Sequence, residues 1–273
     1  MTAAETTPVY LPPSGNLRFT GILASEWTKL RSLRSTVWLL VAAVGMLVGF
    51  GLLFSWGVVS RWDRTGAPER LTFNPTEISL GGVFLAQLAI GVLGVLIISG
   101  EFSTGMIGSS FAAVPKRLPV LWGKALVFGA TALVLMTAAS VAAFEVAQGV
   151  LSAKGIQTTL SSDGVLRAVV CAGLFLTWVA LFGLTLGTIL RNSAAATSTL
   201  VTVLLVVPLL MNFLPSDWRA HIDRWLPTSA GASLMAVHPT DAPLTPGMAG
   251  LVLVIYLLIS FTMAAVLLLK RDI

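Results

Sequence analysis

The sequence predicts an all-α integral membrane protein with six transmembrane helices and both termini in the cytoplasm. Three observations lead to this fold class. Hydrophobic residues make up 56% of the 273 residues and charged residues only 11%, whereas soluble domains carry about 25% charged residues. Six apolar runs reach the length of about 20 residues that a membrane-spanning helix needs. Lys and Arg are more frequent at one set of run ends than at the other, which orients the chain.

The N-terminal segment precedes the first apolar run. Residues 1–21 contain Glu5 and the Pro12-Pro13 pair and lack the apolar core of a signal peptide, so we expect a disordered cytoplasmic N-terminus. The rest of the chain, 22–273, is predicted to be a single transmembrane domain.

An amphipathic interfacial helix is predicted just before the first span. Its apolar side chains recur at helical spacing, and its charged side chains lie largely off that stripe, where they would contact anionic lipid headgroups. The alternative is a short positively charged segment that only sets the orientation of the first span. The predicted interfacial residues are Glu26, Trp27, Lys29, Leu30, Arg31 and Arg34.

The six predicted spans are 36–59, 78–99, 118–144, 165–190, 194–214 and 247–269. Gly45 and Gly49 form a G-x-x-x-G pattern in the first span, which is typical of close helix packing within the chain or at a dimer seam. Lys124 lies near the start of the third span and is expected to extend to the membrane interface. Pro208 is expected to kink the fifth span.

The orientation follows from the basic residues at the span ends. With both termini placed inside, ten Lys and Arg fall on the inner side and seven on the outer side, which favours this orientation. The segment 215–246 then lies outside. It contains a short predicted helix with Trp218 and Trp225 on one face, and this helix either rests on the outer membrane surface or covers an exit pathway.

The sequence lacks the residue patterns that several kinds of chemistry require. The two histidines, His221 and His238, share one loop with no cysteine nearby, so no metal site is predicted, and H-E-x-x-H is absent. The chain also lacks G-x-x-x-x-G-K-[ST], which predicts that it holds no ATP or other cofactor and is not itself an enzyme. Glu145 is the one candidate for a charge at membrane depth, and we expect it at the interface, paired with Arg167. We attribute the excess of basic over acidic residues to contacts with the membrane and not to contacts with nucleic acid.

A polar segment, SGEFSTGMIGSSFAAVPKR, separates the second and third spans. Its connection of about 18 residues exceeds the roughly 2–8 residues of a tight helix–helix link. Length and composition favour a docking surface over a plain loop.

Together, the interfacial prelude ASEWTKLRSLRS, the first span and the G-E-F-x-x-G-x-I pattern at 100–107 resemble the permease subunits of type-2 ATP-binding-cassette (ABC) exporters, especially compact bacterial forms with six spans. The resemblance implies a bacterial plasma-membrane protein that pairs with a second permease chain, identical or homologous, and with two copies of an ATPase subunit that hold ATP and Mg²⁺. It further implies that the 100–117 loop carries a coupling helix that contacts the ATPase. The residues implied are Glu101, Phe102, Ser103, Thr104, Gly105, Met106, Ile107 and Phe111.

Glu101 was expected to stabilise the N-terminus of that coupling helix or to pair with a basic residue of the partner. Two other function classes stay open at this point. A self-contained secondary transporter would move its substrate without an ATPase, and a membrane scaffold or immunity protein would bind a partner without transport.

Overall fold

Every regular element in the described part of the chain is a helix. The computed structural model describes residues 19–103, 105, 117–238 and 242–270. Six helical stretches there are long and apolar enough to cross a membrane: 34–64, 83–103, 118–154, 165–190, 193–211 and 246–270. The chain is therefore a multi-pass membrane protein, and the six predicted spans are confirmed.

The first half of the chain forms α1 (Phe19–Ser32), α2 (Arg34–Arg61), η1 (Trp62–Arg64), α3 (Ala67–Leu71), α4 (Pro75–Ser79), α5 (Val83–Ser103), α7 (Arg117–Leu151) and η2 (Ser152–Lys154). The second half forms α8 (Val165–Leu190), α9 (Ser193–Val201), the π-helical turn η3 (Thr202–Val206), α10 (Val207–Met211), α11 (Ser216–Ile222), η4 (Asp223–Trp225), α12 (Pro227–Met235) and α13 (Pro246–Lys270). Helix α1 begins three residues before the predicted start of the folded domain at residue 22.

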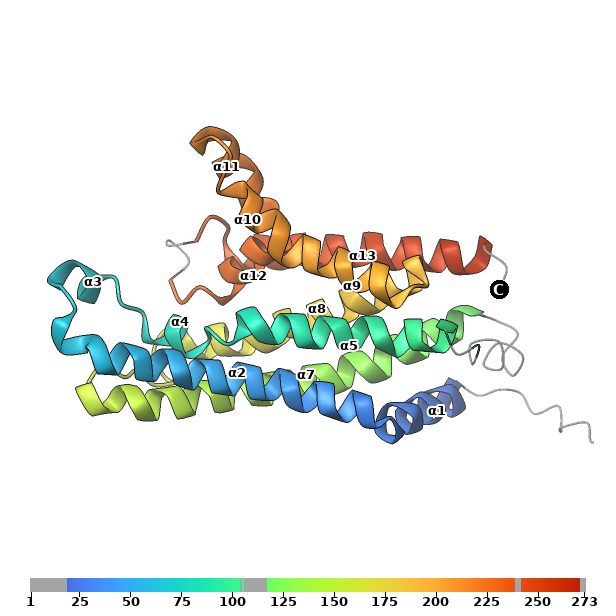
Figure 1. The fold of residues 1–273 in the computed structure, drawn as a ribbon, viewed down its shortest axis with the longest axis horizontal. Coiled ribbons are helices and arrows are strands. Elements are labelled where there is room, and N and C mark those ends of the chain that lie inside the picture. The colour runs from blue at the N-terminus through green and yellow to red at the C-terminus, as the bar shows by residue number, and fades with distance from the viewer. Residues whose placement is uncertain (1–18, 104, 106–116, 239–241, 271–273) are drawn as a thin grey trace, which may run out of the picture.

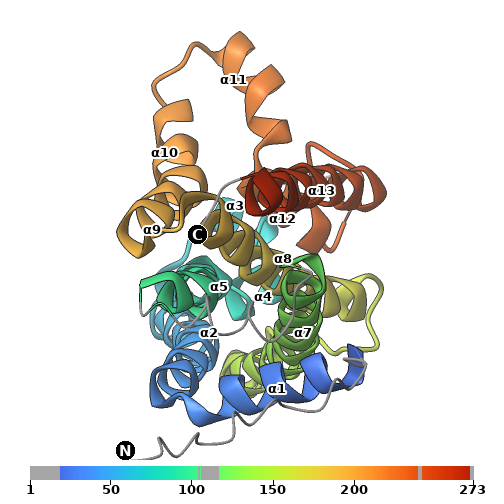
Figure 2. The ribbon, with the colours of Figure 1, turned by 90° about the vertical axis from the view of Figure 1, so that its right-hand side faces the viewer.

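Helix α8 occupies the centre of the bundle, with α2, α5 and α7 on one side and α9 and α13 on the other (Figure 2). In α8, 83% of an 18-residue apolar stretch is buried, compared with 17% in α2. Trp178 of α8 donates its indole N–H to the carbonyl oxygen of Leu253 at 2.6 Å, which ties α13 to the centre.

Close approach of α5 and α8 depends on glycines from both helices. A Cβ on Gly94 of α5 would overlap the carbonyl oxygen of Ala180, and one on Gly183 of α8 would overlap the carbonyl oxygen of Gly91. Small residues allow such contact between helix backbones in membranes. The G-x-x-x-G of α2 differs, because a Cβ on Gly45 or Gly49 would meet no atom within 4 Å. Within the described residues, that motif does not serve intramolecular packing.

The fifth span changes its helical geometry before its proline. The amide of Val207 donates to the carbonyl oxygen of Thr202, a bond between residues five apart that widens the helix into the π-helical turn η3. Pro208 follows directly after this turn in the continuous helix, and because it has no N–H it cannot donate a bond to the preceding turn. The expected irregularity at Pro208 therefore takes the form of a π-helical turn.

Two sets of buried or half-buried polar contacts join elements at the end of the bundle opposite α1. Gln148 of α7 donates to Ser79 Oγ at 2.9 Å and accepts from the amide of Thr158 at 2.8 Å. Arg167 of α8 donates to the carbonyl oxygens of Ala236 and Val237, at 2.6 and 3.1 Å, just after α12. Glu145 is exposed, so the expected Glu145–Arg167 pair is wrong: the guanidinium binds the free carbonyls that follow a helix C-terminus instead.

Helix α1 lies across one end of the bundle, against the starts of α2 and α7 (Figure 2). The last turn of α5 and the end of α13 lie at this same end (Figure 1). We refer to it as the α1 end. Both ends of the described chain thus lie on one side of the bundle, as an even number of spans requires.

Candidate functional site

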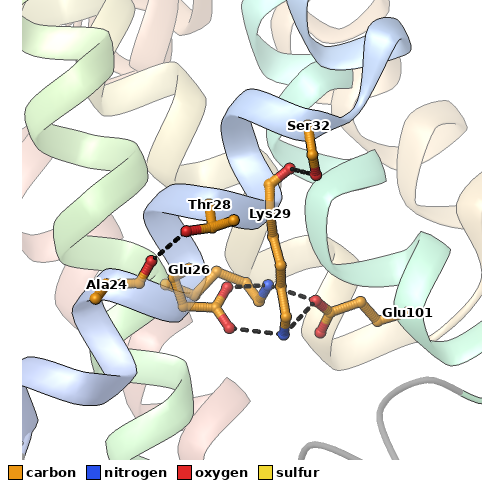
Figure 3. A network of polar contacts seen from close by, with 7 residues as sticks. Ala24, Glu26, Thr28, Lys29, Ser32 and Glu101 are labelled. Carbon is orange, nitrogen blue, oxygen red and sulfur yellow. Dashed lines mark hydrogen bonds and ion pairs between the residues drawn. The ribbon is translucent and has the colours of Figure 1, made fainter.

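The α1 end holds a buried cluster of four charged side chains, which we call the charge cluster: Glu26 and Lys29 of α1, Glu101 of α5 and Lys124 of α7. Lys124 Nζ lies 2.5 Å from Glu26 Oε2 and 2.8 Å from Glu101 Oε1. Lys29 Nζ lies 2.8 Å from Glu26 Oε1 and 3.1 Å from Glu101 Oε1, the oxygen that Lys124 also contacts. Figure 3 shows Glu26, Lys29 and Glu101 pointing toward one another between the helices.

Three side chains of the charge cluster are buried, and the fourth, that of Lys29, is 28% exposed. The side chains of Lys124 and Glu26 are 3% and 4% exposed, and that of Glu101 is 11% exposed. Buried charges require partners to offset their lost hydration, and each charge here has at least one opposite charge in contact. The formal charges of the four residues sum to zero, so the cluster can be buried as a unit.

Local sequence explains how α1 reaches α7. Ile22 and Glu26 are four residues apart and are the two buried residues of α1, so they share one face of the helix. A Cβ on Gly123 would lie 2.7 Å from Ile22 Cγ2, which shows that Gly123 provides the space in which Ile22 packs. Lys124 follows directly and meets Glu26.

Two sequence-based expectations are corrected here. Glu26 was placed on the lipid-facing polar side of the interfacial helix, but it faces the bundle because Lys124 neutralises its charge there. Lys124 was expected to extend to the membrane interface, yet its side chain is buried between two carboxylates. Trp27, Arg31 and Arg34 are exposed and Leu30 is half-buried, and their contact with the membrane interface stays a prediction.

Glu101 also differs from its expected position. It lies in the last turn of α5, which extends to Ser103, four residues past the predicted span end, and not at the start of a new helix. A negative charge near a helix C-terminus is unfavourable because the carbonyl end of the helix dipole is also negative. The ammonium groups of Lys29 and Lys124 compensate for this position.

The remaining predicted contact residues divide into two groups. Phe102 is half-buried with the guanidinium of Arg191 over its ring, 5.1 Å from the centroid, while Ser103 and Gly105 are exposed. Thr104, Met106, Ile107 and Phe111 lie outside the described residues. A contact of any of these residues with an ATPase stays a prediction.

Arg191 and Ser193 are functional candidates that sequence reasoning missed. Arg191 ends α8 in the left-handed conformation, with φ of 52°, and its side chain reaches Phe102. Two residues later, Ser193 Oγ lies 2.8 Å from Ser99 Oγ of α5. The α8–α9 turn is therefore held against the last turns of α5. The one signal in the sequence for this contact was that Arg191 and Glu101 fall on the same predicted side of the membrane, the cytoplasmic side.

A separate apolar cavity of about 560 Å³ lies toward the opposite end, between α5, α8, η3–α10 and α12. Its lining includes Gln87, Leu204, Pro208 and Thr228. Gln87 Oε1 and Thr228 Oγ1 are buried, and neither has a hydrogen-bond partner in the described part of the chain. Mostly apolar cavities of 300–1,000 Å³ with a few polar groups are typical of small-molecule sites.

No protein-family model matches the sequence, and no curated protein matches it either.

Proposed function

We propose that this chain is the permease subunit of an ATP-driven exporter of the ABC type, oriented with both termini in the cytoplasm of a bacterial cell. The charge cluster is the observation that carries the proposal. It fastens α1 to the last turn of α5 and the first turns of α7, the two helices that flank the segment 104–116. A force applied to that segment by a partner would move these three helices together.

The chain's own composition supports an external energy source. It lacks a nucleotide-binding P-loop, and Glu145 is exposed instead of lying inside the bundle as a proton-carrying residue would. The apolar cavity beside Gln87 and Pro208 would hold an apolar or amphipathic cargo. It borders η3, whose π-helical geometry is common at functional positions in membrane helices.

The test is affinity purification of the tagged full-length chain from membranes of its native host. We expect a co-purified protein that contains a P-loop motif and hydrolyses ATP. Ile107→Asp in the predicted contact segment should abolish co-purification. Leu71→Asp is the matched control, because it introduces the same charge at a residue 88% exposed at the opposite end of the bundle.

Two results would overturn the proposal. If Ile107→Asp and Leu71→Asp retained the ATPase equally, the 104–111 segment would not be the contact. If the reconstituted chain moved a cargo without any ATPase present, it would be a secondary transporter. A compound panel added to the purified complex should include at least one molecule that stimulates ATP hydrolysis.

A further inference from the structure

A second cavity, of about 340 Å³, adjoins the charge cluster at the α1 end. It is bounded by α1, the start of α2, the last turns of α5 and the first part of α7. Its apolar walls come from Leu30, Leu33, Leu96, Ile97, Val127 and Phe128. Leu33 and Leu96 are 53% and 37% exposed, so the cavity has apolar side chains at its outer edge and charged side chains on its inner wall.

The inner wall offers an acceptor for a cation. Glu101 lines the cavity, and both lysine contacts of its carboxylate are made by Oε1. Its other oxygen, Oε2, is buried and has no hydrogen-bond partner among the residues that the structure describes. An unpaired buried carboxylate oxygen is costly, and an ammonium group is the strongest partner for it. The χ3 torsion of glutamate has a broad minimum, so the Glu101 carboxylate can rotate to share its two oxygens between the lysines and a donor in the cavity.

The neighbouring wall favours an anion. Ser32, Ser35 and Thr36, around the start of α2, line the cavity, and no side chain caps the first turn of that 28-residue helix. The first N–H groups of a helix have no intrahelical partner and carry partial positive charge, which favours phosphate. Lys29, which also lines the cavity with its side chain 28% exposed, adds a positive charge on this side.

We infer that this cavity binds the headgroup of a zwitterionic phospholipid with a primary ammonium group, of the phosphatidylethanolamine type. The ammonium group donates to Glu101 Oε2, the phosphate lies at the start of α2 beside Lys29, and the acyl chains leave past Leu33 and Leu96 into the bilayer. A free anion would leave Glu101 Oε2 without a donor, and a simple cation would leave the helix start unused. The inference does not depend on the proposed transport function or on the orientation of the chain.

The experiment is native mass spectrometry of the full chain in detergent, with added lipids of identical acyl chains. The probes are phosphatidylethanolamine, phosphatidylcholine and phosphatidylglycerol. Phosphatidylcholine keeps the positive charge but has no N–H to donate. A charge-assisted hydrogen bond predicts about tenfold more retained phosphatidylethanolamine than phosphatidylcholine. Glu101→Gln should reduce that preference at least fivefold.

A second variant keeps the test decisive if Glu101→Gln fails to fold. Gly100 lines the cavity, and a Cβ there would meet no atom of the described residues within 4 Å, so Gly100→Leu adds an apolar side chain at the cavity wall. We expect it to lower retained phosphatidylethanolamine to the phosphatidylcholine level. Gly149→Leu is the matched control, because Gly149 has equally open surroundings near the other end of α7. Equal retention of phosphatidylethanolamine by Gly100→Leu and Gly149→Leu would overturn the inference. Binding of phosphatidylglycerol as strong as that of phosphatidylethanolamine would also overturn it.

Discussion

Lys124 and Glu26 form a buried ion pair, with Nζ 2.5 Å from Oε2, although 98 positions separate them in the sequence. The pair connects the helix that lies across the bundle to the third span. Because Lys124 also contacts Glu101, one ammonium group holds three helices together at the α1 end. Its loss should therefore affect stability more than the loss of an exposed lysine.

We predict that Lys124→Met destabilises the protein by about 3–5 kcal/mol, because it leaves Glu26 and Glu101 buried with only Lys29 to neutralise them. The double variant Glu26→Leu/Lys124→Met should be more stable than Lys124→Met alone, since it removes the uncompensated carboxylate. Thermal unfolding of both variants in the same detergent checks this order. A double variant less stable than Lys124→Met would show that the charges do not act as a pair.

The charge cluster also shows which features of the structure could not be predicted from the sequence. Apolar run length placed all six spans, because crossing a membrane constrains composition along the chain itself. The depth of a charged residue depends on partners from other helices. Glu26 and Lys124 were each assigned to the surface because the partners that bury them come from other helices: Lys124 for Glu26, and Glu26 and Glu101 for Lys124.

The end of α5 illustrates the same limit. Gly100, Glu101 and Ser103 were assigned to a loop because they are polar or small, yet the helix continues through them. The compensating lysines come from α1 and α7, 72 and 23 positions away. By contrast, the close packing of α5 and α8 rests on glycines that these two helices carry in their own sequences.

We predict that Gly94→Ala disrupts the α5–α8 contact. Its methyl group would overlap the carbonyl oxygen of Ala180, and backbone cannot move aside as a side chain can. Overpacking of this kind costs about 1–3 kcal/mol. Gly45→Ala is the matched control in α2, where the new methyl meets nothing within 4 Å and stability should be unchanged or slightly raised. Unfolding midpoints of the two variants should differ clearly, and equal midpoints would contradict the packing described.

Arg167→Lys should weaken the link between α8 and the residues after α12. The guanidinium donates to the carbonyl oxygens of Leu234, Ala236 and Val237, and an ammonium group cannot match this planar arrangement. We expect a loss of about 1–3 kcal/mol and faster protease cleavage near residue 237. Arg70→Lys serves as the control, since the exposed Arg70 donates one bond, to Trp62. Similar cleavage rates in both variants would show that the carbonyl contacts add little.

Lys29 gives the charge cluster a pH dependence with a definite sign. Burial alone would lower the pKa of its ammonium group, but hydrogen bonds and charges from Glu26 and Glu101 outweigh burial, so the pKa is raised. A raised pKa contributes stability that is fully present below the unfolded-state value of about 10.4 and declines as pH rises from there through the folded-state value. The difference in stability between the wild type and Lys29→Met should therefore be constant near neutral pH and shrink above about pH 10.4. Unfolding midpoints measured from pH 7 to 11.5 check this, with Lys270→Met as the control, because it removes a lysine from the exposed end of α13 without touching the charge cluster. A difference that grew with pH would mean that the carboxylates do not hold the proton on Lys29.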